Sequence, residues 1–167
     1  MAFATMIETP LGPFRVEADD HAVTKAEFNA PPITVGSTNR VLDQLRAELS
    51  EYFAGRRNEF TIALNPSGTD FQKRVWNELL RIAFGETICY HELAMRIGKP
   101  TADRAVAQAN GANPLCILIP CHRVIAKDGR LGGYSSGLER KRFLLGLEQG
   151  QMIDSKGFNL EVQECSC

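Results

Sequence analysis

The residues of this chain best suited to chemistry lie in one short stretch, where a proline, a cysteine, a histidine and an arginine follow one another. Residues 117–119 form an apolar run of strand type, and Pro120, which has a fixed φ and no N–H, ends it. We therefore expect Cys121 at the end of a buried strand. His122 and Arg123 favour a nucleophilic thiolate by charge or hydrogen bonding. Because adjacent side chains of an extended segment point to opposite sides, we expect His122 to reach the sulfur through a water molecule.

Two other interpretations of this stretch stay open. A cysteine after an apolar run is commonly an inert core residue, because a reduced cysteine packs as a small hydrophobe. A zinc site would use Cys116, Cys121 and His122, but these residues lack the paired spacing of zinc ligands. No other motif points to a metal or an organic cofactor, and the sequence predicts neither.

The chain divides at the turn-rich segment Asn65-Pro66-Ser67-Gly68 into parts of different charge. Residues 1–67 hold 6 Lys and Arg against 9 Asp and Glu, residues 68–150 hold 12 against 8, and residues 151–167 hold 1 against 3. The basic excess accompanies Cys121 and allows a polyanionic partner. We expect a packing domain over 1–67, a domain that carries the chemistry over 68–150, and a loosely packed tail over 151–167.

The first part has the pattern of a small antiparallel sheet with one helix. Short alternating runs over 3–7, 14–18 and 23–28 are separated by turn residues. Apolar residues at helical spacing predict a helix over 38–53, and we expect a further strand over 60–64. This sequence has no cluster of titratable residues and no glycine-rich loop, so we assign it to packing.

The second part has a mainly helical pattern. Thr69 and Gln72 form a capping box for a helix that we expect to end near residue 84. Two short helices over 90–97 and 101–110, joined by a turn with glycine, match the helix-turn-helix pattern. The second of these is rich in small residues, which suits either a packed core or close approach to a DNA groove.

The last elements are a glycine-rich loop over 131–137, whose backbone can approach a ligand closely, and a helix over 138–147. We expect Arg140, Lys141 and Arg142 of that helix to be exposed. The whole pattern predicts the α+β class: a small N-terminal antiparallel-sheet domain with a helix, then a mainly helical domain with a helix-turn-helix and the reactive cysteine.

The sequence contains no apolar run near the ~20 residues that a membrane span requires. Its first residues lack the basic start and the apolar core of a signal peptide. We therefore expect no membrane partner and an intracellular protein, cytoplasmic in a bacterium or archaeon and nuclear in a eukaryote.

Six sequence blocks resemble, in order, the DNA alkyltransferases that repair guanine alkylated at oxygen 6. The pentapeptide at 120–124 is similar to the active-site signature of that family, and the resemblance covers about residues 68–148. The other five blocks are Gly68-Thr69-x-Phe71-Gln72, Gly85-x-Thr87-x-x-Tyr90, Arg104-Ala105-Val106, Ala109-Asn110-Gly111-x-Asn113-Pro114 and Gly132-x-Tyr134-Ser135-x-Gly137.

The resemblance implies DNA repair by direct reversal of damage. Cys121 would take an alkyl group such as methyl from oxygen 6 of guanine, and also from oxygen 4 of thymine, and keep it as a thioether. A thioether is not hydrolysed under physiological conditions, so each molecule would react once and irreversibly. His122 would accept the thiol proton through a water, Glu148 would orient the imidazole, and Asn113 would hold the loop near the sulfur.

The resemblance also implies a partner and a binding mode: a monomer would bind the minor groove of double-stranded DNA that carries an alkylated guanine. The target nucleotide would flip out of the stack, Arg104 would fill the gap, and Tyr90 would press on the target phosphate. The implied DNA contacts are Tyr90, Arg104, Ala102, Ala105, Thr101, Gly111 and Arg123.

The implied pocket for the flipped base lies beside the cysteine. The main-chain carbonyls of Cys121 and Val124 would accept from the guanine amine, and the Ser135 N–H would reach oxygen 6. Tyr134 would form a wall. The residues of this pocket are Tyr90, Gly132, Val124, Tyr134 and Ser135.

Several positions depart from the family pattern, among them Ala83-Phe84, which replaces an isoleucine-proline pair often seen in bacterial members. Cys89 stands where a serine or threonine cap is usual, Ala107 where glycine is frequent, and Ser136 where a glycine lies by the pocket. Proteins of other classes also remain as alternatives. A lesion-binding protein of the same fold would lack the cysteine, a helix-turn-helix regulator accounts for 90–111 alone, and a cysteine hydrolase would turn over.

Overall fold

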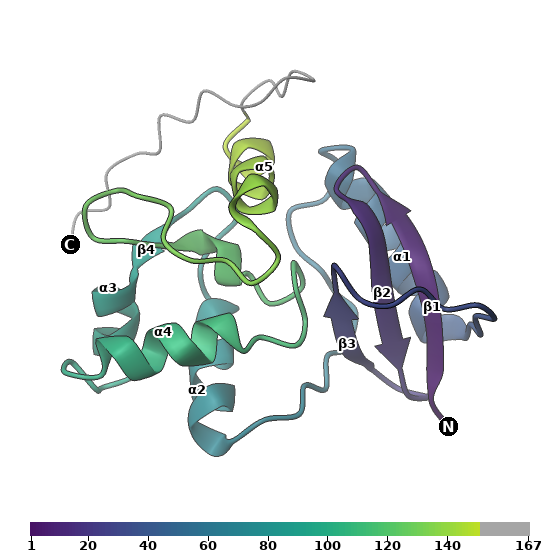
Figure 1. Cartoon of the computed structure of the whole chain (residues 1–167), viewed down its shortest axis with the longest axis horizontal. Coiled ribbons are helices and arrows are strands. Elements are labelled where there is room, and N and C mark those ends of the chain that lie inside the picture. The colour runs from purple at the N-terminus through teal and green to yellow at the C-terminus, as the bar shows by residue number, and fades with distance from the viewer. Residues whose placement is uncertain (151–167) are drawn as a thin grey trace. The chain divides into compact units, whose positions relative to one another are not determined.

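The computed structural model describes residues 1–150 and divides into two compact units (Figure 1). Unit 1 comprises residues 1–67 with 114–118, and unit 2 comprises residues 68–113 with 119–150 of the described chain. Unit 1 is an antiparallel sheet with a helix, and unit 2 is mainly helical. The predicted α+β class is confirmed. The expected tail over 151–167 lies outside the described residues.

The sheet of unit 1 contains β1 (Phe3–Thr9), β2 (Gly12–Ala18) and β3 (Val23–Glu27), paired antiparallel in that order. Gly12, with φ 105°, lets the chain reverse between β1 and β2, where Thr9 pairs with Gly12. Every second residue of β2 is buried, as in a sheet with one face on a core. These buried residues are Phe14, Val16 and Ala18.

Helix α1 (Arg40–Phe53) packs against β1 and β2. The Asn39 side chain caps it by accepting a hydrogen bond from the Leu42 N–H at 3.0 Å. Apolar residues at helical spacing face the sheet and are buried. They are Val41, Leu42, Leu45 and Leu49.

The strand expected over 60–64 is wrong, because most of this segment is irregular and only Leu64 makes a bridge, with Val23. The buried carboxylate of Glu48 accepts hydrogen bonds from the Thr61 N–H at 3.0 Å and the Ile62 N–H at 3.3 Å. A side chain of α1 thus takes the donors that a strand ladder would have used.

Unit 2 has three helices that pack against one another and a fourth that packs against the cysteine segment. The first three are α2 (Asp70–Leu79), α3 (Tyr90–Arg96) and α4 (Asp103–Gly111), and the fourth is α5 (Leu138–Glu148). The remaining elements are the parallel strands β4 (Ile88–Cys89) and β5 (Val124–Ile125) and the 3₁₀ turn η1 (Cys121–Arg123).

The start of α2 is confirmed and its expected end is wrong. Thr69 and Gln72 form the predicted reciprocal capping box. The helix ends at Leu79 rather than near residue 84, because the Arg81 and Ile82 N–H groups bond to carbonyls three residues back and wind the chain into tight turns.

Helices α3 and α4 form the predicted helix-turn-helix pair. Gly98, with φ 74°, follows α3 and turns the chain toward α4. The Cys89 sulfur replaces the usual hydroxyl cap and accepts from the Glu92 N–H at 3.4 Å. The second helix begins at Asp103 rather than Thr101, and no side chain caps its first turn among the described residues.

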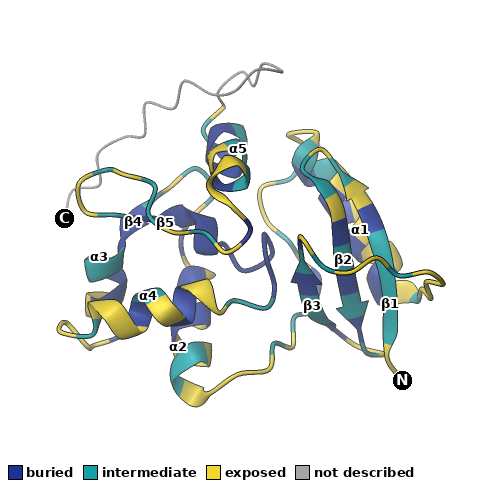
Figure 2. Ribbon diagram, viewed as in Figure 1, coloured by how far each residue is buried: buried dark blue, intermediate teal, exposed yellow. Residues whose placement is uncertain are grey.

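The apolar run before Cys121 is not a strand, which corrects the prediction. Ile117 has φ 70°, and the Leu118 N–H bonds to the Cys116 carbonyl across a turn. The residues are nonetheless buried (Figure 2). Burial alone does not separate a strand from a buried turn, and only Leu115 makes a bridge, with Ala26 of β3.

Within residues 1–150, no helix has both the length and the apolar character that crossing a membrane requires.

Candidate active site

Cys121 begins the turn η1 rather than ending a strand. Its N–H bonds to the Ile119 carbonyl at 2.8 Å, and the Arg123 N–H bonds to the Pro120 carbonyl at 3.0 Å. The side chain holds a reduced thiol, and the residue is 3% exposed. This tight turn, set by a proline, leaves only a small part of Cys121 exposed.

His122 is held from behind by a carboxylate. Its Nε2 atom lies 2.8 Å from Oε1 of Glu148, the last residue of α5, and both residues are buried. A carboxylate only accepts, so Nε2 carries the hydrogen and a neutral imidazole keeps its lone pair on Nδ1. That Nδ1 is buried and has no hydrogen-bond partner among residues 1–150. The imidazole is thus arranged to take a proton at Nδ1.

Arg123 is buried as well, and it binds the other side of the same carboxylate. Its Nε donates to Oε2 of Glu148 at 2.9 Å, its Nη2 donates to Oε1 at 2.7 Å, and its Nη1 donates to the Ile82 carbonyl at 2.6 Å. The expected contact of Arg123 with DNA is therefore wrong, because the guanidinium is used inside unit 2.

Glu148 stays ionised despite its burial. Burial raises the pKa of this carboxyl, but His122 and Arg123 oppose it by charge and hydrogen bonding, and the balance lowers the pKa to about 2. The three side chains form one ion-pair network behind the cysteine.

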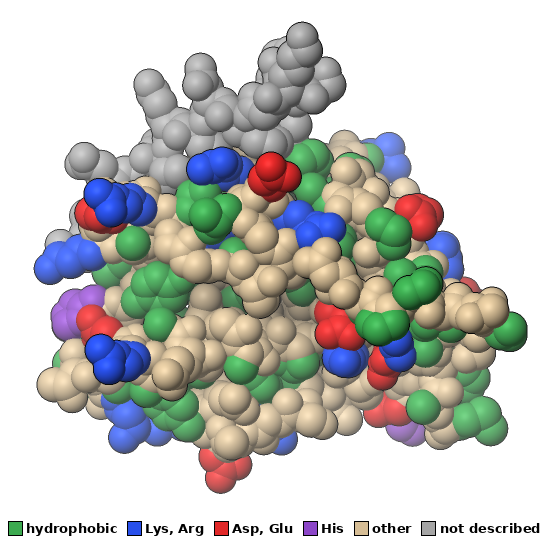
Figure 3. Space-filling view, viewed as in Figure 1, with side chains coloured by type: hydrophobic (Ala, Val, Ile, Leu, Met, Phe, Trp, Pro, Cys, Tyr) green, Lys and Arg blue, Asp and Glu red, His purple; other side chains and the backbone are tan. Residues whose placement is uncertain are grey.

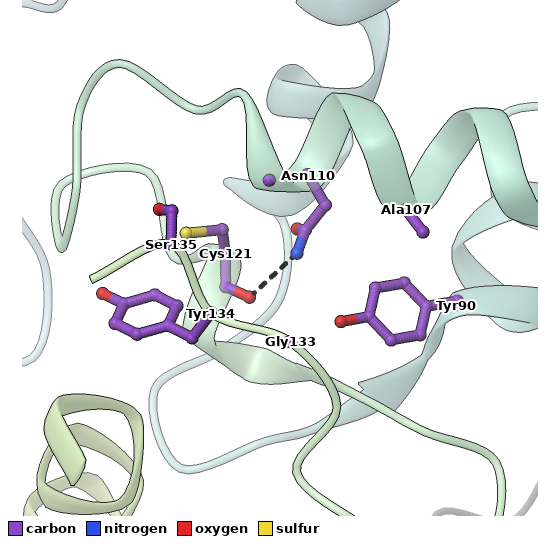
Figure 4. A pocket seen from close by; sticks show the side chains of 8 residues that line it. Tyr90, Ala107, Asn110, Cys121, Gly133, Tyr134 and Ser135 are labelled. Atoms are coloured by element: carbon purple, nitrogen blue, oxygen red, sulfur yellow. Dashed lines mark hydrogen bonds between the residues drawn. The ribbon is translucent and has the colours of Figure 1, made fainter. Parts of the chain in front are cut away.

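A cavity of about 470 Å³ opens on the front of the cysteine (Figure 4). Tyr90 at the start of α3 and Asn110 on α4 lie on one side, and the loop from Gly133 to Ser135 lies on the other. Burial, and then the charge of Cys121, raises the pKa of Tyr90, so this phenol stays neutral. The residues that line the cavity are Tyr90, Ala107, Asn110, Gly111, Cys121, Gly133, Tyr134 and Ser135.

Two asparagines fix the backbone around the sulfur. Asn113 donates from Nδ2 to the Ile119 carbonyl at 2.8 Å, two residues before the cysteine. Asn110, which sequence reasoning did not assign to the site, donates to the Cys121 carbonyl at 3.3 Å. The spacing of three residues between Ala107 and Asn110 is the sequence signal that could have predicted this role, since residues at this spacing share a helix face.

The pocket loop also contacts α3. Gly132 has φ 69°, and a Cβ atom there would lie 3.0 Å from the Tyr90 hydroxyl. The loop therefore lies against the Tyr90 ring because residue 132 has no side chain. Ser136, expected beside the pocket, is buried but is not among the residues that line the cavity in the described chain.

Lys141 corrects the prediction of an exposed basic face on α5. The residue has 0% exposure, and its Nζ donates to the Val124 carbonyl at 2.7 Å and the Gly133 carbonyl at 3.2 Å. Burial lowers the pKa of Lys141, Cys121 opposes this by charge, and the balance is about 8. The ammonium joins the cysteine segment to the pocket loop. Sequence reasoning missed it because both acceptors are backbone atoms far along the chain.

Helix α4 presents an exposed face beside the cavity (Figure 2). Val106, Ala109 and Asn110 are buried, so the packed-core interpretation of the small residues holds for one face, and the other face is exposed. On the face drawn in Figure 3, Lys and Arg side chains lie dispersed, several of them beside Asp and Glu. The expected DNA contacts that are at least partly exposed are Tyr90, Thr101, Ala102, Arg104, Ala105 and Gly111.

The arrangement supports nucleophilic displacement by a thiol. Cys121 lines the cavity, and a base and a carboxylate lie behind it. Within the described chain, no three His, Cys, Asp or Glu side chains gather in a way that could hold a metal ion.

Two family models match the chain. The model of the 6-O-methylguanine DNA methyltransferase ribonuclease-like domain matches residues 3–66, and that of the DNA binding domain of the same name matches residues 70–150. A methylated-DNA--protein-cysteine methyltransferase of Methanosarcina barkeri is 42% identical over 153 residues, which cover 88% of this chain and 97% of the relative.

Two solved structures of Mycobacterium tuberculosis proteins are also similar. The structure of OGT in complex with DNA has a TM-score of 0.81 at 42% identity, and the match covers 88% of this chain and 92% of that chain. The structure of an O6-methylguanine methyltransferase has a TM-score of 0.82 at 39% identity, with 93% of this chain and 97% of that chain covered.

Proposed function

This chain belongs to the 6-O-methylguanine DNA methyltransferase family, and from this membership we infer that it repairs DNA by moving an alkyl group onto one of its own cysteines. Its activity is that of a methylated-DNA--protein-cysteine methyltransferase. DNA is its partner. The observation that supports Cys121 as the reacting residue is its place in the cavity wall, with the His122–Glu148 pair behind it.

The proposed reaction is one displacement at carbon. His122 takes the thiol proton at Nδ1 through a water, and Glu148 stabilises the imidazolium that forms. The Cys121 sulfur forms a bond to the alkyl carbon while the bond from that carbon to oxygen 6 breaks. The electron pair stays on guanine, which takes up a proton. The product is a thioether, so one molecule repairs one lesion.

The proposed substrate is an alkylated guanine that has left the stack, because the alkyl carbon is inaccessible inside a duplex. The small and exposed residues of α4 let that helix approach the minor groove, and Arg104 fills the space left by the base. Tyr90 presses on the target phosphate. We propose oxygen 4 of alkylated thymine as a second substrate and a monomer as the active form.

The proposed base contacts share carbonyls with the protein's own hydrogen bonds. Asn110 already binds the Cys121 carbonyl, and Lys141 binds that of Val124. The Val124 N–H also donates to the Cys121 carbonyl, so a guanine amine bound there shares that oxygen with two protein donors. The Ser135 N–H donates to oxygen 6, and this hydrogen bond makes guanine a better leaving group. Tyr134 forms a wall of the pocket.

We also propose a division of labour along the chain. Residues 68–150 bind DNA and transfer the alkyl group, with Asn113 as a holder of the active-site loop. Residues 1–67 act as a packing domain.

Intact mass spectrometry tests the proposed reaction. The protein is mixed with an oligonucleotide duplex that contains one O6-methylguanine. We expect a single added methyl group, mapped to Cys121 and saturating at one equivalent. Cys121→Ala should take no methyl, whereas Cys116→Ala, which removes the other reduced cysteine that lies buried in residues 1–150, should react as the unchanged chain does. Tight lesion binding without mass change would reveal a recognition protein, and guanine release with repeated turnover would reveal a hydrolase.

A further inference from the structure

The Glu148 carboxylate has more partners than the orientation of a histidine requires. One oxygen binds His122, and a guanidinium grips both oxygens from the other side. The third nitrogen of that Arg123 side chain binds the Ile82 carbonyl beyond α2, and the ring of Phe84 lies 5.9 Å from the guanidinium carbon. A fork with three anchors fixes both the position and the plane of the carboxylate.

The charges around His122 alternate along this network. The imidazole lies between Cys121 and Arg123 in η1, and it faces Glu148 of α5. A second residue of α5, Lys141, interacts with Cys121 by charge. The turn after α2 contributes the Ile82 carbonyl, which is polar but uncharged. When the thiol proton moves to His122, the order is thiolate, imidazolium, carboxylate, guanidinium. Without Arg123, the remaining thiolate, imidazolium and carboxylate of this series would together hold one net negative charge.

We propose that Arg123 is a positioning residue for the alkyl transfer: its guanidinium locks Glu148 against His122 and balances the carboxylate charge, so that the imidazole is free to take the thiol proton. This role rests on the function proposed above. It replaces the contact with DNA that the family resemblance implies for Arg123, and it explains why an arginine directly after the cysteine and histidine is buried at 7% exposure.

The sign of the effect follows from charge. Removing a buried cation makes every proton release nearby less favourable, because the product of that release is more negative. The pH at which the Cys121–His122 pair becomes nucleophilic should therefore rise in Arg123→Met. A purely structural role would lower the rate by one factor at all pH values.

The test measures Cys121 itself, without DNA. The rate of alkylation of Cys121 by iodoacetamide is followed by peptide mass mapping over pH about 5 to 9. For Arg123→Met we expect the acid limb of the rate profile to move up by about one pH unit, a loss of about tenfold on that limb, with recovery at high pH. Arg123→Lys keeps the charge and should retain the unchanged chain's profile at a lower plateau.

Two further variants control for position and for folding. Arg74→Met is the matched control, because Arg74 also donates to a backbone carbonyl, that of Ile97 at 2.7 Å, but is not part of the Glu148 network. Its profile should match that of the unchanged chain. Arg123→Met combined with Glu148→Gln restores the charge balance, should return the acid limb toward its original pH, and serves if the single variant fails to fold.

A profile of Arg123→Met that superimposes on that of the unchanged chain, or that falls by one factor at every pH, would overturn the proposal. So would an acid limb that stays shifted in the double variant. Because the probe is iodoacetamide, an unchanged chain that takes no methyl from the duplex would refute the proposed function, while a shift in Arg123→Met would still support the role of Arg123.

Discussion

Glu148 shows how single side chains set the chemistry of this protein. It ends a helix, and its sequence position alone predicts a surface carboxylate. The structure instead gives it one histidine and one arginine as partners at 2.7–2.9 Å and buries it. A buried charge is tolerated only with such partners, so removing either one should cost more than removing a surface ion pair.

The depressed pKa of Glu148 predicts an acid-dependent loss of stability. Its pKa is about 2 in the folded protein against an ordinary 4.5, so the unfolded state binds more protons between these values. The stabilisation is complete above pH 4.5, is lost as the pH falls toward 2, and amounts to about 3 kcal/mol. Urea unfolding of the protein and of Glu148→Gln across this range should show the free energies of unfolding converging with acid. Parallel curves would contradict the ion-pair network.

A second prediction at this scale concerns the contact of Gly132 with Tyr90. Gly132→Ala places a Cβ 3.0 Å from the Tyr90 hydroxyl at a φ of 69°, so it should lower the free energy of unfolding by about 1–3 kcal/mol. Gly133→Ala is the matched control, since its Cβ would meet nothing within 4 Å. Urea denaturation midpoints of the two variants give the comparison, and equal midpoints would refute the prediction.

At the scale of elements, the sequence predicts best where the signals are local. The capping box at Thr69 and the glycine after α3 act within a few residues, and the start of α2 and the end of α3 are found within a residue of where they are expected. The segment at 60–64 and the run at 117–119 depend on distant partners, such as a carboxylate on α1 and the edge of β3. Only the family resemblance predicts that Cys121, His122 and Glu148 act together, because Glu148 reaches the other two through the packing of α5.

Lys141 of α5 yields a prediction for alkaline solutions. Its pKa is about 8 in the folded protein against an ordinary 10.5, so between these values the unfolded state holds the proton that the folded state has released. The free energy of unfolding should therefore rise with pH over this window, by about 3 kcal/mol in total. Lys141→Met should lack this rise. Chemical denaturation at both ends of the window measures it, and an identical pH dependence of the two proteins would contradict the burial of the ammonium.

At the scale of the whole molecule, the site combines two kinds of surface. The function proposed above assigns the cavity with Cys121 to the reaction with the base, and the exposed face of α4 to contact with the duplex from which that base comes. Reaction on DNA thus requires both surfaces, whereas reaction on a free alkylated base requires the cavity alone.

A substitution of Arg104 distinguishes reaction on duplex DNA from reaction on a free base. Its side chain lies on the exposed face of α4 and is not among the residues that line the cavity in the described chain. Arg104→Ala should slow methyl transfer from a duplex at least tenfold. Without the arginine side chain, nothing fills the space that the flipped base leaves, so the flipped-out state is less stable. The rate of methyl transfer from free O6-methylguanine should change less than twofold relative to that of the unchanged chain. Equal losses on the two substrates, measured by mass spectrometry, would refute the flipping role.

The short segment from Pro114 to Leu118 belongs to unit 1 although the chain on both sides of it belongs to unit 2. The Ala26 N–H and carbonyl on β3 bond to Pro114 and Cys116, so the last strand of the first unit finds its edge partners far later in the sequence. During synthesis on the ribosome, a nascent chain that ends at Ser67 therefore has its sheet but not this edge. The first unit is completed only when the segment directly before the reactive cysteine has emerged.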